Sequence, residues 1–265
     1  MTTPFHLLPG DAPLLVSMPH VGTALPAGVA ERLTPPARSL PDTDWLLVEL
    51  YDFLPELGVG RLHAVYSRQL IDLNRPPDDA PLYATTTTGL VPTELFDGTP
   101  SWREGEAPDA DERAARLEAY WRPYHDALAA ERARLRERHG EMLLLDLHSI
   151  GSVVPRLFEG VLPELNLGTN QGRSCAPGLA AALEQAVAPG PYRQVTDGRF
   201  RGGYITRRYG EPDAGLHALQ LELSQATYMD EGAAPAIDAA RAAEVRPWLR
   251  AFVEAALAWI VERTR

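Results

Sequence analysis

Four short runs of apolar residues, separated by longer segments with helical periodicity, constrain the fold of this chain more than any other feature. The runs are Leu14–Met18, Leu62–Leu73, Met142–Leu147 and Leu216–Leu223. Near-continuous apolar runs of this length are typical of strands that are buried on both faces of a sheet. Strands that alternate with helices indicate a three-layer α/β fold.

Apolar residues recur at helical spacing in four segments between and after these runs. The predicted helices lie within residues 46–57, 109–139, 179–187 and 234–264. Asp42 or Asp44 is a candidate N-cap for the first helix, and Pro123 should kink the second helix or begin a new one. The Pro- and Thr-rich segment Arg75–Pro100 predicts a long loop, and loops of that length often carry function. Because no repeat or low-complexity linker interrupts the chain, we expect residues 1–265 to form one domain.

Charge and composition exclude several classes of protein. The formal net charge of −11 argues against nucleic acid or an anionic membrane as a partner. No apolar run approaches the roughly 18 residues of a membrane span, and Met1–Pro9 does not resemble a signal peptide. The single cysteine, Cys175, permits no intrachain disulfide, so these features together predict a cytoplasmic protein. All 25 basic residues are arginine, which excludes lysine Schiff-base chemistry and a P-loop.

Two of the seven histidines stand where an α/β enzyme places metal ligands. His20 follows the first apolar run and His148 follows the third, and sites in open α/β sheets form at the carboxyl ends of strands. Neutral imidazoles there are natural zinc ligands, and a carboxylate would complete a three-ligand site that is open to water. The alternative is that both are hydrogen-bonded histidines at strand ends.

Several acids could work with these histidines. Asp146 lies two residues before His148, so both side chains leave the strand on one face, and Asp146 is a candidate ligand or orienting partner. Asp42 and Asp44 are a further pair, with helix capping as the alternative role. Glu222 lies near the end of an apolar strand, where burial raises a carboxyl pKa toward the range of a general base. Its alternative position is the polar face of an edge strand.

Arginines are the candidate substrate-binding residues, although only their placement is informative. Asn74 and Arg75 follow an apolar run together with Asp72, and guanidinium binds a carboxylate bidentately. A structural pair between Asp72 and an arginine is the alternative. The segment Gly198–Gly210 has four arginines and no acid, and it is either a cationic wall for an anionic substrate or a solvated hairpin. The motifs Gly-x-Ser-x-Gly, His-Glu-x-x-His, Cys-x-x-Cys and Gly-x-Gly-x-x-Gly are absent from the sequence.

Seven sequence blocks, in order along nearly the whole chain, carry a resemblance to a known family. The blocks are Ser-Met-Pro-His (17–20), Asp-Thr-Asp-Trp (42–45), Ser-Arg…Asp-Leu-Asn-Arg (67–75), Asp-Leu-His-Ser (146–149), Leu-Asn-Leu-Gly-Thr-Asn (165–170), Gly-Arg-Phe-Arg-Gly-Gly-Tyr-Ile-Thr (198–206) and Gln-Leu-Glu-Leu-Ser-Gln (220–225). With these blocks the chain resembles the N-formylglutamate amidohydrolases of bacterial histidine degradation. That family in turn resembles the zinc carboxypeptidases and aspartoacylase, which implies a mixed, largely parallel sheet between helices.

The resemblance implies a zinc-dependent hydrolysis of N-formyl-L-glutamate to formate and L-glutamate, with His20 and His148 as metal ligands. It implies that Glu222 is the base, and that an arginine, with Arg68 favoured, stabilises the oxyanion. In the related enzymes a glutamate three residues after the first histidine is also a ligand, but this chain has Thr23 there. We therefore expect Asp44, rather than Asp42 or Asp146, to be the remaining ligand.

The expected substrate is a small anionic amino-acid derivative, and the resemblance implies how the chain binds it. Asn74 and Arg75 would hold one carboxylate, and Arg199, Arg201 and Arg207 the other. The alternatives are a deacylase of another N-acyl amino acid, a carboxypeptidase for small peptides, and a binding protein that kept the fold without the chemistry.

Overall fold

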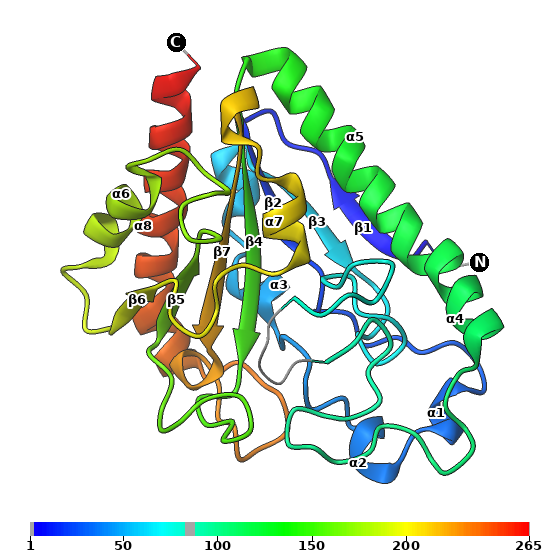
Figure 1. Cartoon of the computed structure of the whole chain (residues 1–265). Coiled ribbons are helices and arrows are strands. Elements are labelled where there is room, and N and C mark those ends of the chain that lie inside the picture. The colour runs from blue at the N-terminus through cyan, green and yellow to red at the C-terminus, as the bar shows by residue number, and fades with distance from the viewer. Residues whose placement is uncertain (1–2, 83–87, 265) are drawn as a thin grey trace.

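The computed structural model, which describes residues 3–82 and 88–264, is built on one seven-stranded sheet. The strands are β1 (Phe5–Leu8), β2 (Leu14–Met18), β3 (Gly60–Ala64), β4 (Met142–Ile150), β5 (Leu165–Gly168), β6 (Gln194–Thr196) and β7 (Leu216–Ser224). Their order across the sheet is β1-β3-β2-β4-β7-β5-β6 (Figure 1). The central strands β3, β2, β4 and β7 are parallel, whereas β1 pairs antiparallel with β3 and β5 pairs antiparallel with β7. The predicted mixed, largely parallel sheet is therefore confirmed.

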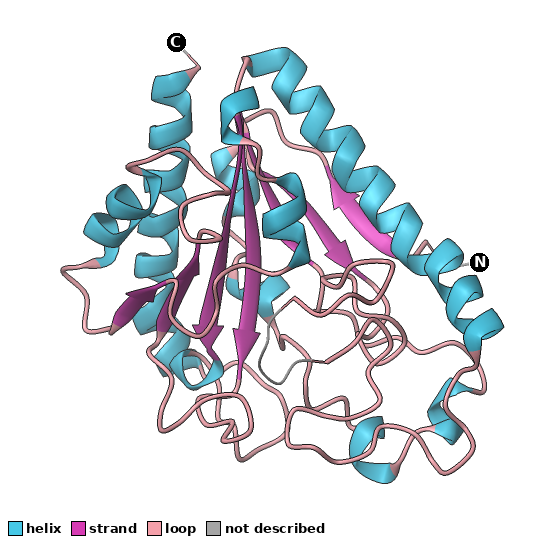
Figure 2. Cartoon of the chain, in the orientation of Figure 1, coloured by secondary structure: helices cyan, strands magenta, loops and turns pink. Residues whose placement is uncertain are grey.

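Helices cover both faces of the sheet, which gives the predicted three layers (Figure 2). The α-helices are α1 (Val29–Arg32), α2 (Pro35–Arg38), α3 (Leu47–Leu50), α4 (Ala110–Arg116), α5 (Arg122–His139), α6 (Leu179–Val187), α7 (Tyr204–Tyr209) and α8 (Ala239–Arg263). Short 3-10 turns are η1 (Leu54–Leu57), η3 (Pro212–Ala214) and η4 (Gln225–Thr227), and η2 (Leu117–Trp121) is a π-helical turn. Among the helices of the described chain, none combines the length and the apolar character that a membrane span requires.

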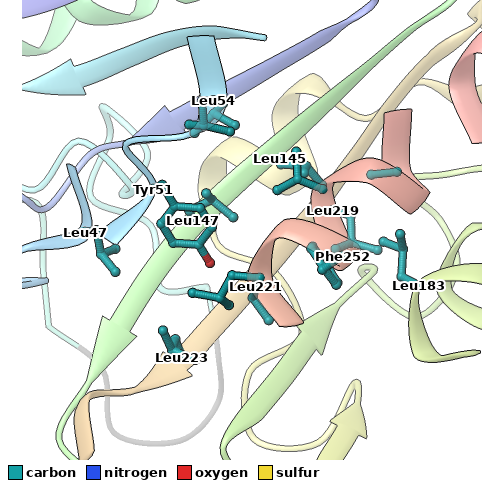
Figure 3. Close-up of a cluster of buried hydrophobic side chains, with 14 of the residues drawn as sticks. Leu47, Tyr51, Leu54, Leu145, Leu147, Leu183, Leu219, Leu221, Leu223 and Phe252 are labelled. Carbon is teal, nitrogen blue, oxygen red and sulfur yellow. The ribbon is translucent and has the colours of Figure 1, made fainter. Parts of the chain in front are cut away.

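The alternation of side chains along each strand divides the core into two clusters. Leu145 and Leu147 of β4 face the same side as Leu219 and Leu221 of β7, where they pack with α3, α6 and α8 (Figure 3). Intervening residues such as Leu144 face the other side, where they pack with α5 and α7. Polar side chains at even-numbered positions near the ends of β4 and β7 therefore point to the α5 and α7 side.

The sequence predicted most of the central elements, but one predicted strand extends well beyond the end of the observed strand. Strand β2 and helix α6 have the predicted limits, while β4 and β7 continue past theirs. The predicted strand Leu62–Leu73 ends at Ala64, and the residues that follow form turns. Leu70 and Ile71 are nevertheless buried, so the apolar run reflects burial of a loop rather than continued pairing in the sheet.

Two further predictions concern the starts of helices. The N-cap of α3 is Leu46, which has a left-handed conformation and makes no side-chain cap, so the predicted capping by Asp42 or Asp44 is wrong. In the long helical region α4 gives way to the π-turn η2, and α5 begins at Arg122 with Pro123 in its first turn. Proline is tolerated in the first turn because an N–H at that position has no acceptor within the helix, so the expected break at Pro123 is confirmed.

The predictions for the long loop and for the arginine-rich segment agree in part with the structure. Residues 75–82 and 88–100 contain no helix or strand, while residues 83–87 of the expected loop lie outside the described part of the chain. Residues 198–203 form a loop and α7 follows directly, so the described segment is a loop and a helix rather than a hairpin.

Candidate active site

Polar side chains gather at the carboxyl ends of the two central strands. Asp146 pairs in register with Gln220, and His148 pairs in register with Glu222. All four side chains point to the face covered by α5 and α7, because they occupy even-numbered positions. Both strands end at the loop-rich side of the molecule (Figure 1). Parallel pairing therefore brings residues that are more than 70 positions apart in sequence to one point.

His20, Asp44 and His148 form a buried group whose candidate ligand atoms all lie within 4.8 Å of one another. The Nδ1 atom of His148 is 2.9 Å from Asp44 Oδ2, and the Nδ1 atom of His20 is 3.7 Å from the same oxygen. The loop that carries Asp44 is fixed to the first histidine by a hydrogen bond from the Asp44 backbone N–H to His20 O. Two nitrogens and one carboxylate oxygen thus converge on one small volume.

The remaining ring nitrogens each contact a different buried carboxylate. His20 Nε2 is 2.7 Å from Asp72 Oδ1, and His148 Nε2 is 2.9 Å from Asp146 Oδ2. A carboxylate can only accept, so Nε2 of each ring carries a proton. His148 Nδ1 also faces a carboxylate, Asp44 Oδ2, and would be protonated as well until a metal took the place of that proton, whereas His20 Nδ1 accepts from Arg68 Nη1 over 3.3 Å. Partners of this kind orient metal-bound histidines. The contact of Asp146 fits the orienting role that the sequence had left open for it.

The charges around the histidines favour a cation. Asp44, Asp72, Asp146 and Glu222 are buried there, whereas Arg68 is the buried cation beside them. Burial acts to lower the pKa of His148, but the adjacent carboxylates of Asp146 and Asp44 outweigh it and hold that pKa well above its usual value. A divalent ion would supply the missing positive charge.

The donor set suits zinc in particular. Zinc binds imidazole nitrogen and carboxylate oxygen at about 2.0–2.2 Å in tetrahedral geometry, which separates neighbouring ligand atoms by roughly 3.3 Å. The distances from Asp44 to the two histidines, 2.9 and 3.7 Å, lie on either side of that value. Three protein ligands also leave a fourth position open, as in catalytic zinc sites. His20, Asp44 and His148 therefore fit this metal.

Glu222 lies beside this group on an interior strand. Strand β7 runs between β4 and β5, so the edge-strand position considered for Glu222 is wrong. Burial raises the pKa of Glu222 to about 8, although the nearby His148 acts in the opposite direction. The Gln220 amide donates to its Oε2 over 3.3 Å. A buried carboxyl with a raised pKa beside a metal-ligand group is a candidate general acid or base.

A pocket that opens to solvent is lined by His20, Asp44, His148 and Glu222. Three arginines are among the described residues that line it, namely Arg68, Arg75 and Arg199. Arg68 is buried, donates to Asp72 Oδ2 over 2.6 Å and stacks on Phe96, with 4.7 Å from its Cζ to the ring centroid. Its Nη1 is 3.3 Å from His20 Nδ1, so this guanidinium lies directly beside the candidate metal site.

Asn74 and Arg75 line the cavity but also bond to the protein. The Asn74 amide donates to Asp146 Oδ2 over 3.2 Å, and its Oδ1 accepts from the Ile205 N–H over 2.8 Å. Arg75 donates from Nε to Thr88 O and from Nη1 to its neighbour's carbonyl, Asn74 O. Both side chains are thereby held at the cavity wall.

The three arginines predicted on the later segment are placed differently from one another. Arg199 lines the cavity, where its Nε donates to Leu157 O over 2.6 Å. Arg201 is exposed and donates to Gly198 O. Arg207 donates to Gly202 O and to Leu82 O. Within the described residues, Arg199 is the member of this set that contributes to the cavity wall.

Three contacts of the site were not anticipated from the sequence. Asp72 was considered a partner of an arginine, and it does bind Arg68, but its bond to His20 was not expected because 52 residues separate the two. Asp42 was a candidate ligand, and its Oδ2 instead accepts from the Phe96 N–H. Gln220 accepts from the Gly203 N–H and thereby joins β7 to the loop before α7. The alternation of polar positions along β7 was the one available signal for Gln220.

Comparison with known proteins agrees with this arrangement. A family model described as N-formylglutamate amidohydrolase matches residues 12–229. The chain is 54% identical over 255 residues to the N-formylglutamate deformylase of Pseudomonas aeruginosa and 51% identical to that of Pseudomonas putida, with 96% of each chain covered in both cases. A crystal structure of N-formylglutamate amidohydrolase from Ralstonia eutropha JMP134 is similar over 99% of this chain and 100% of that one, with a TM-score of 0.82 and 27% identity. A structure from Agrobacterium tumefaciens, at 19% identity and a TM-score of 0.74, shares the fold over 98% of this chain and 95% of that one.

Proposed function

The chain belongs to the N-formylglutamate amidohydrolase family, and we propose that it hydrolyses N-formyl-L-glutamate to formate and L-glutamate. The observation that carries the proposal is the position of Glu222 beside the buried group of His20, Asp44 and His148, inside a cavity lined by arginines. As the family resemblance implies, this reaction would serve histidine degradation, and we propose the cytoplasm, which the composition predicts, as its location.

His20, Asp44 and His148 would hold the metal, for which zinc is our proposal. Zinc there would supply a Lewis acid that polarises a carbonyl and acidifies water. Asp72 and Asp146 would keep both imidazoles in the tautomer whose Nδ1 faces Asp44. The protein thus prepares its ligands before the metal binds.

Glu222 would move the proton of the reaction. In its ionised form it would take a proton from the attacking water and then deliver that proton to the nitrogen of the leaving glutamate. Burial raises its pKa to about 8, which brings its basicity close to that needed near neutral pH. Arg68 lies beside the ligand group and would stabilise negative charge that develops on the formyl oxygen.

The cavity arginines would bind the two carboxylates of the substrate. We propose Arg75, with Asn74 beside it, for one carboxylate and Arg199 for the other, because these three residues line the cavity. Asn74 bonds to Asp146 and to the Ile205 N–H, so we propose that it also keeps the Arg75 loop in place. A dicarboxylate needs this local reversal of sign in a protein of net charge −11.

A substrate comparison with metal analysis tests the proposal. Purified protein should contain about one zinc per chain and should hydrolyse N-formylglutamate with a higher kcat/KM than N-acetylglutamate or a peptidyl-glutamate. Preference for either of the other compounds would favour the deacylase or carboxypeptidase alternative. Bound metal without turnover of any of the three would favour the binding-protein alternative.

A further inference from the structure

Asp44, which we propose as a metal ligand, lies on a loop. Residues 42–46 contain no helix or strand and precede α3. A ligand on such a segment needs other contacts to keep its carboxylate at the metal. The hydrogen bond from the Asp44 N–H to His20 O is one such contact, and the backbone carbonyls of the residues before and after Asp44 make others.

A buried hydrogen-bond network holds these two carbonyls. Gln225 donates from Nε2 to Thr43 O over 2.9 Å, and the Tyr228 hydroxyl donates to Trp45 O over 2.8 Å. The two carbonyls belong to the residues immediately before and after Asp44. Both donors come from the segment that follows β7, at the end of the strand that carries Glu222.

Ser149 closes the network, and every proton in it can be assigned. The Tyr228 hydroxyl gives its one hydrogen to Trp45 O, so across the 2.8 Å contact between the two hydroxyls Ser149 must donate to Tyr228. Ser149 Oγ in turn accepts the second hydrogen of the Gln225 amide over 3.3 Å. Ser149 directly follows His148 in β4, so the network ties the loop of one ligand to the strand of another.

We propose that Gln225 and Tyr228 are positioning residues that hold Asp44 in the metal site. The inference rests on the proposed function of His20, Asp44 and His148 as metal ligands. Gln225 and Tyr228 are buried, with 6% and 0% of their surface exposed, so water cannot replace their bonds to the loop carbonyls. Neither residue reaches the metal ligands directly, and both act through the backbone around Asp44.

Gln225→Ala and Tyr228→Phe test the inference through the metal rather than through activity. Each variant removes a side-chain donor from one carbonyl beside Asp44, although Thr43 O still accepts from the Trp45 N–H, so we expect zinc affinity to fall about 10- to 100-fold, as for partners that orient ligands. Zinc affinity is measured by competition with a chelator. The visible spectrum of the cobalt(II)-substituted protein should also change in both variants, because it reports the geometry of the ligands.

Tyr209→Phe is the matched control, because it also removes a buried tyrosine hydroxyl. That hydroxyl contacts His125 beneath α5 and, within the described chain, makes no hydrogen bond to the loop of Asp44. The control should lose stability to a similar extent while its zinc affinity and cobalt spectrum stay those of the unchanged protein. Unchanged affinity and spectrum in Gln225→Ala and Tyr228→Phe would overturn the inference, as would equal losses in Tyr209→Phe. If the unchanged protein bound no metal, the proposed function would fail instead.

Discussion

Asp44 and Asp146 are both buried carboxylates within hydrogen-bonding distance of His148, yet they contact different nitrogens of its ring. Asp44 faces Nδ1 together with His20, whereas Asp146 contacts Nε2 and also accepts from the Ser17 hydroxyl and the Asn74 amide. A carboxylate that already accepts three hydrogen bonds from the protein has little capacity left for a metal. This difference at the level of single atoms supports our proposal that Asp44 is the ligand and Asp146 the orienting residue.

The assignment predicts unequal losses of metal. Asp44→Ala should remove stoichiometric zinc, as should His20→Ala and His148→Ala, because each deletes a ligand. Asp146→Ala should retain a weaker site, with affinity lower by about 10- to 100-fold. Elemental analysis followed by chelator competition measures both effects. If Asp44→Ala kept stoichiometric zinc and Asp146→Ala lost it, Asp146 would be the ligand and Asp44 the orienting residue.

Glu222 should be required for turnover but not for the metal. Glu222→Gln preserves the size of the side chain and its place in β7, but the amide cannot take a proton from water. We expect unchanged zinc content and a fall in kcat of about 10²-fold or more, the usual size of a general acid–base contribution. Steady-state kinetics on metal-loaded protein provides the measurement. Near-normal kcat would return Glu222 to a structural role.

Arg199 and Arg201 form a matched pair for testing how the substrate is bound, since they lie two residues apart and only Arg199 lines the cavity among described residues. Arg199→Ala should lower kcat/KM for N-formylglutamate. The corresponding loss of transition-state stabilisation should be roughly 1.5–3 kcal/mol, the range for hydrogen bonds to charged groups. The loss should shrink for the analogue in which the contacted carboxylate is an amide. Arg201→Ala should leave kcat/KM nearly unchanged. Equal effects of the two variants would contradict the placement of the second carboxylate.

At the scale of elements, the long apolar strands at the centre of the sheet could be predicted, and the short strands toward its two edges could not. β2, β4 and β7 are recognisable in the sequence as apolar runs because both of their faces are buried. β1, β5 and β6 have three or four residues each, which is too short for a periodic pattern to stand out from the surrounding loops. The residues after Ala64 were mistaken for strand because a buried loop and a buried strand have the same composition.

The candidate site was predictable where it follows strand ends and not where it depends on loops. His148 and Glu222 could be paired from the sequence because parallel strands end at one edge of a sheet. No spacing in the sequence relates Asp72 to His20, or Gln225 to the loop of Asp44, because those contacts arise only after the loops pack. The family resemblance, rather than periodicity, selected Asp44, and the structure places it beside both histidines.

His125 connects helix α5 to two other elements and gives the fold a pH dependence. Its Nε2 donates to Leu73 O over 2.8 Å, and its Nδ1 therefore accepts from the Tyr209 hydroxyl over 2.9 Å. Burial lowers the pKa of His125 from 6.5 to about 4. The unfolded chain thus takes up a proton at higher pH than the folded protein does. The contribution of this residue to stability is full above pH 6.5 and decreases as the pH falls from 6.5 toward 4.

His125→Gln should reduce this pH dependence. Below pH 6.5 the free energy of unfolding of the unchanged protein should fall by about 1.4 kcal/mol per pH unit on account of this residue. Urea titrations between pH 7.5 and 5 measure the slope in both proteins. His63, whose pKa burial also lowers to about 4, is present in both, so only the difference between the slopes reports on His125. Identical slopes would show that His125 is not held neutral by burial.

At the scale of the whole molecule, one sheet carries both hydrophobic clusters. Strands β2, β4 and β7 each place alternate side chains in the cluster beneath α8 and in the cluster beneath α5. The candidate ligands depend on the same strands, since His148 lies in β4 and His20 follows β2. Unfolding of either helical layer would expose one face of β2, β4 and β7 and would leave their apolar side chains in water.

We therefore propose that residues 1–265 unfold as one unit. Hydrogen exchange read by mass spectrometry along a denaturant titration can follow peptides from α5, α8 and β4 separately. The most protected amides of all three elements should be lost with one midpoint, because neither layer buries its apolar face without the sheet. Removal of zinc should lower all three midpoints together, since a ligand of the native state stabilises the whole cooperative unit. Separate midpoints for α5 and α8 would divide the chain into two units, and a shift confined to β4 would restrict the effect of the metal to its own site.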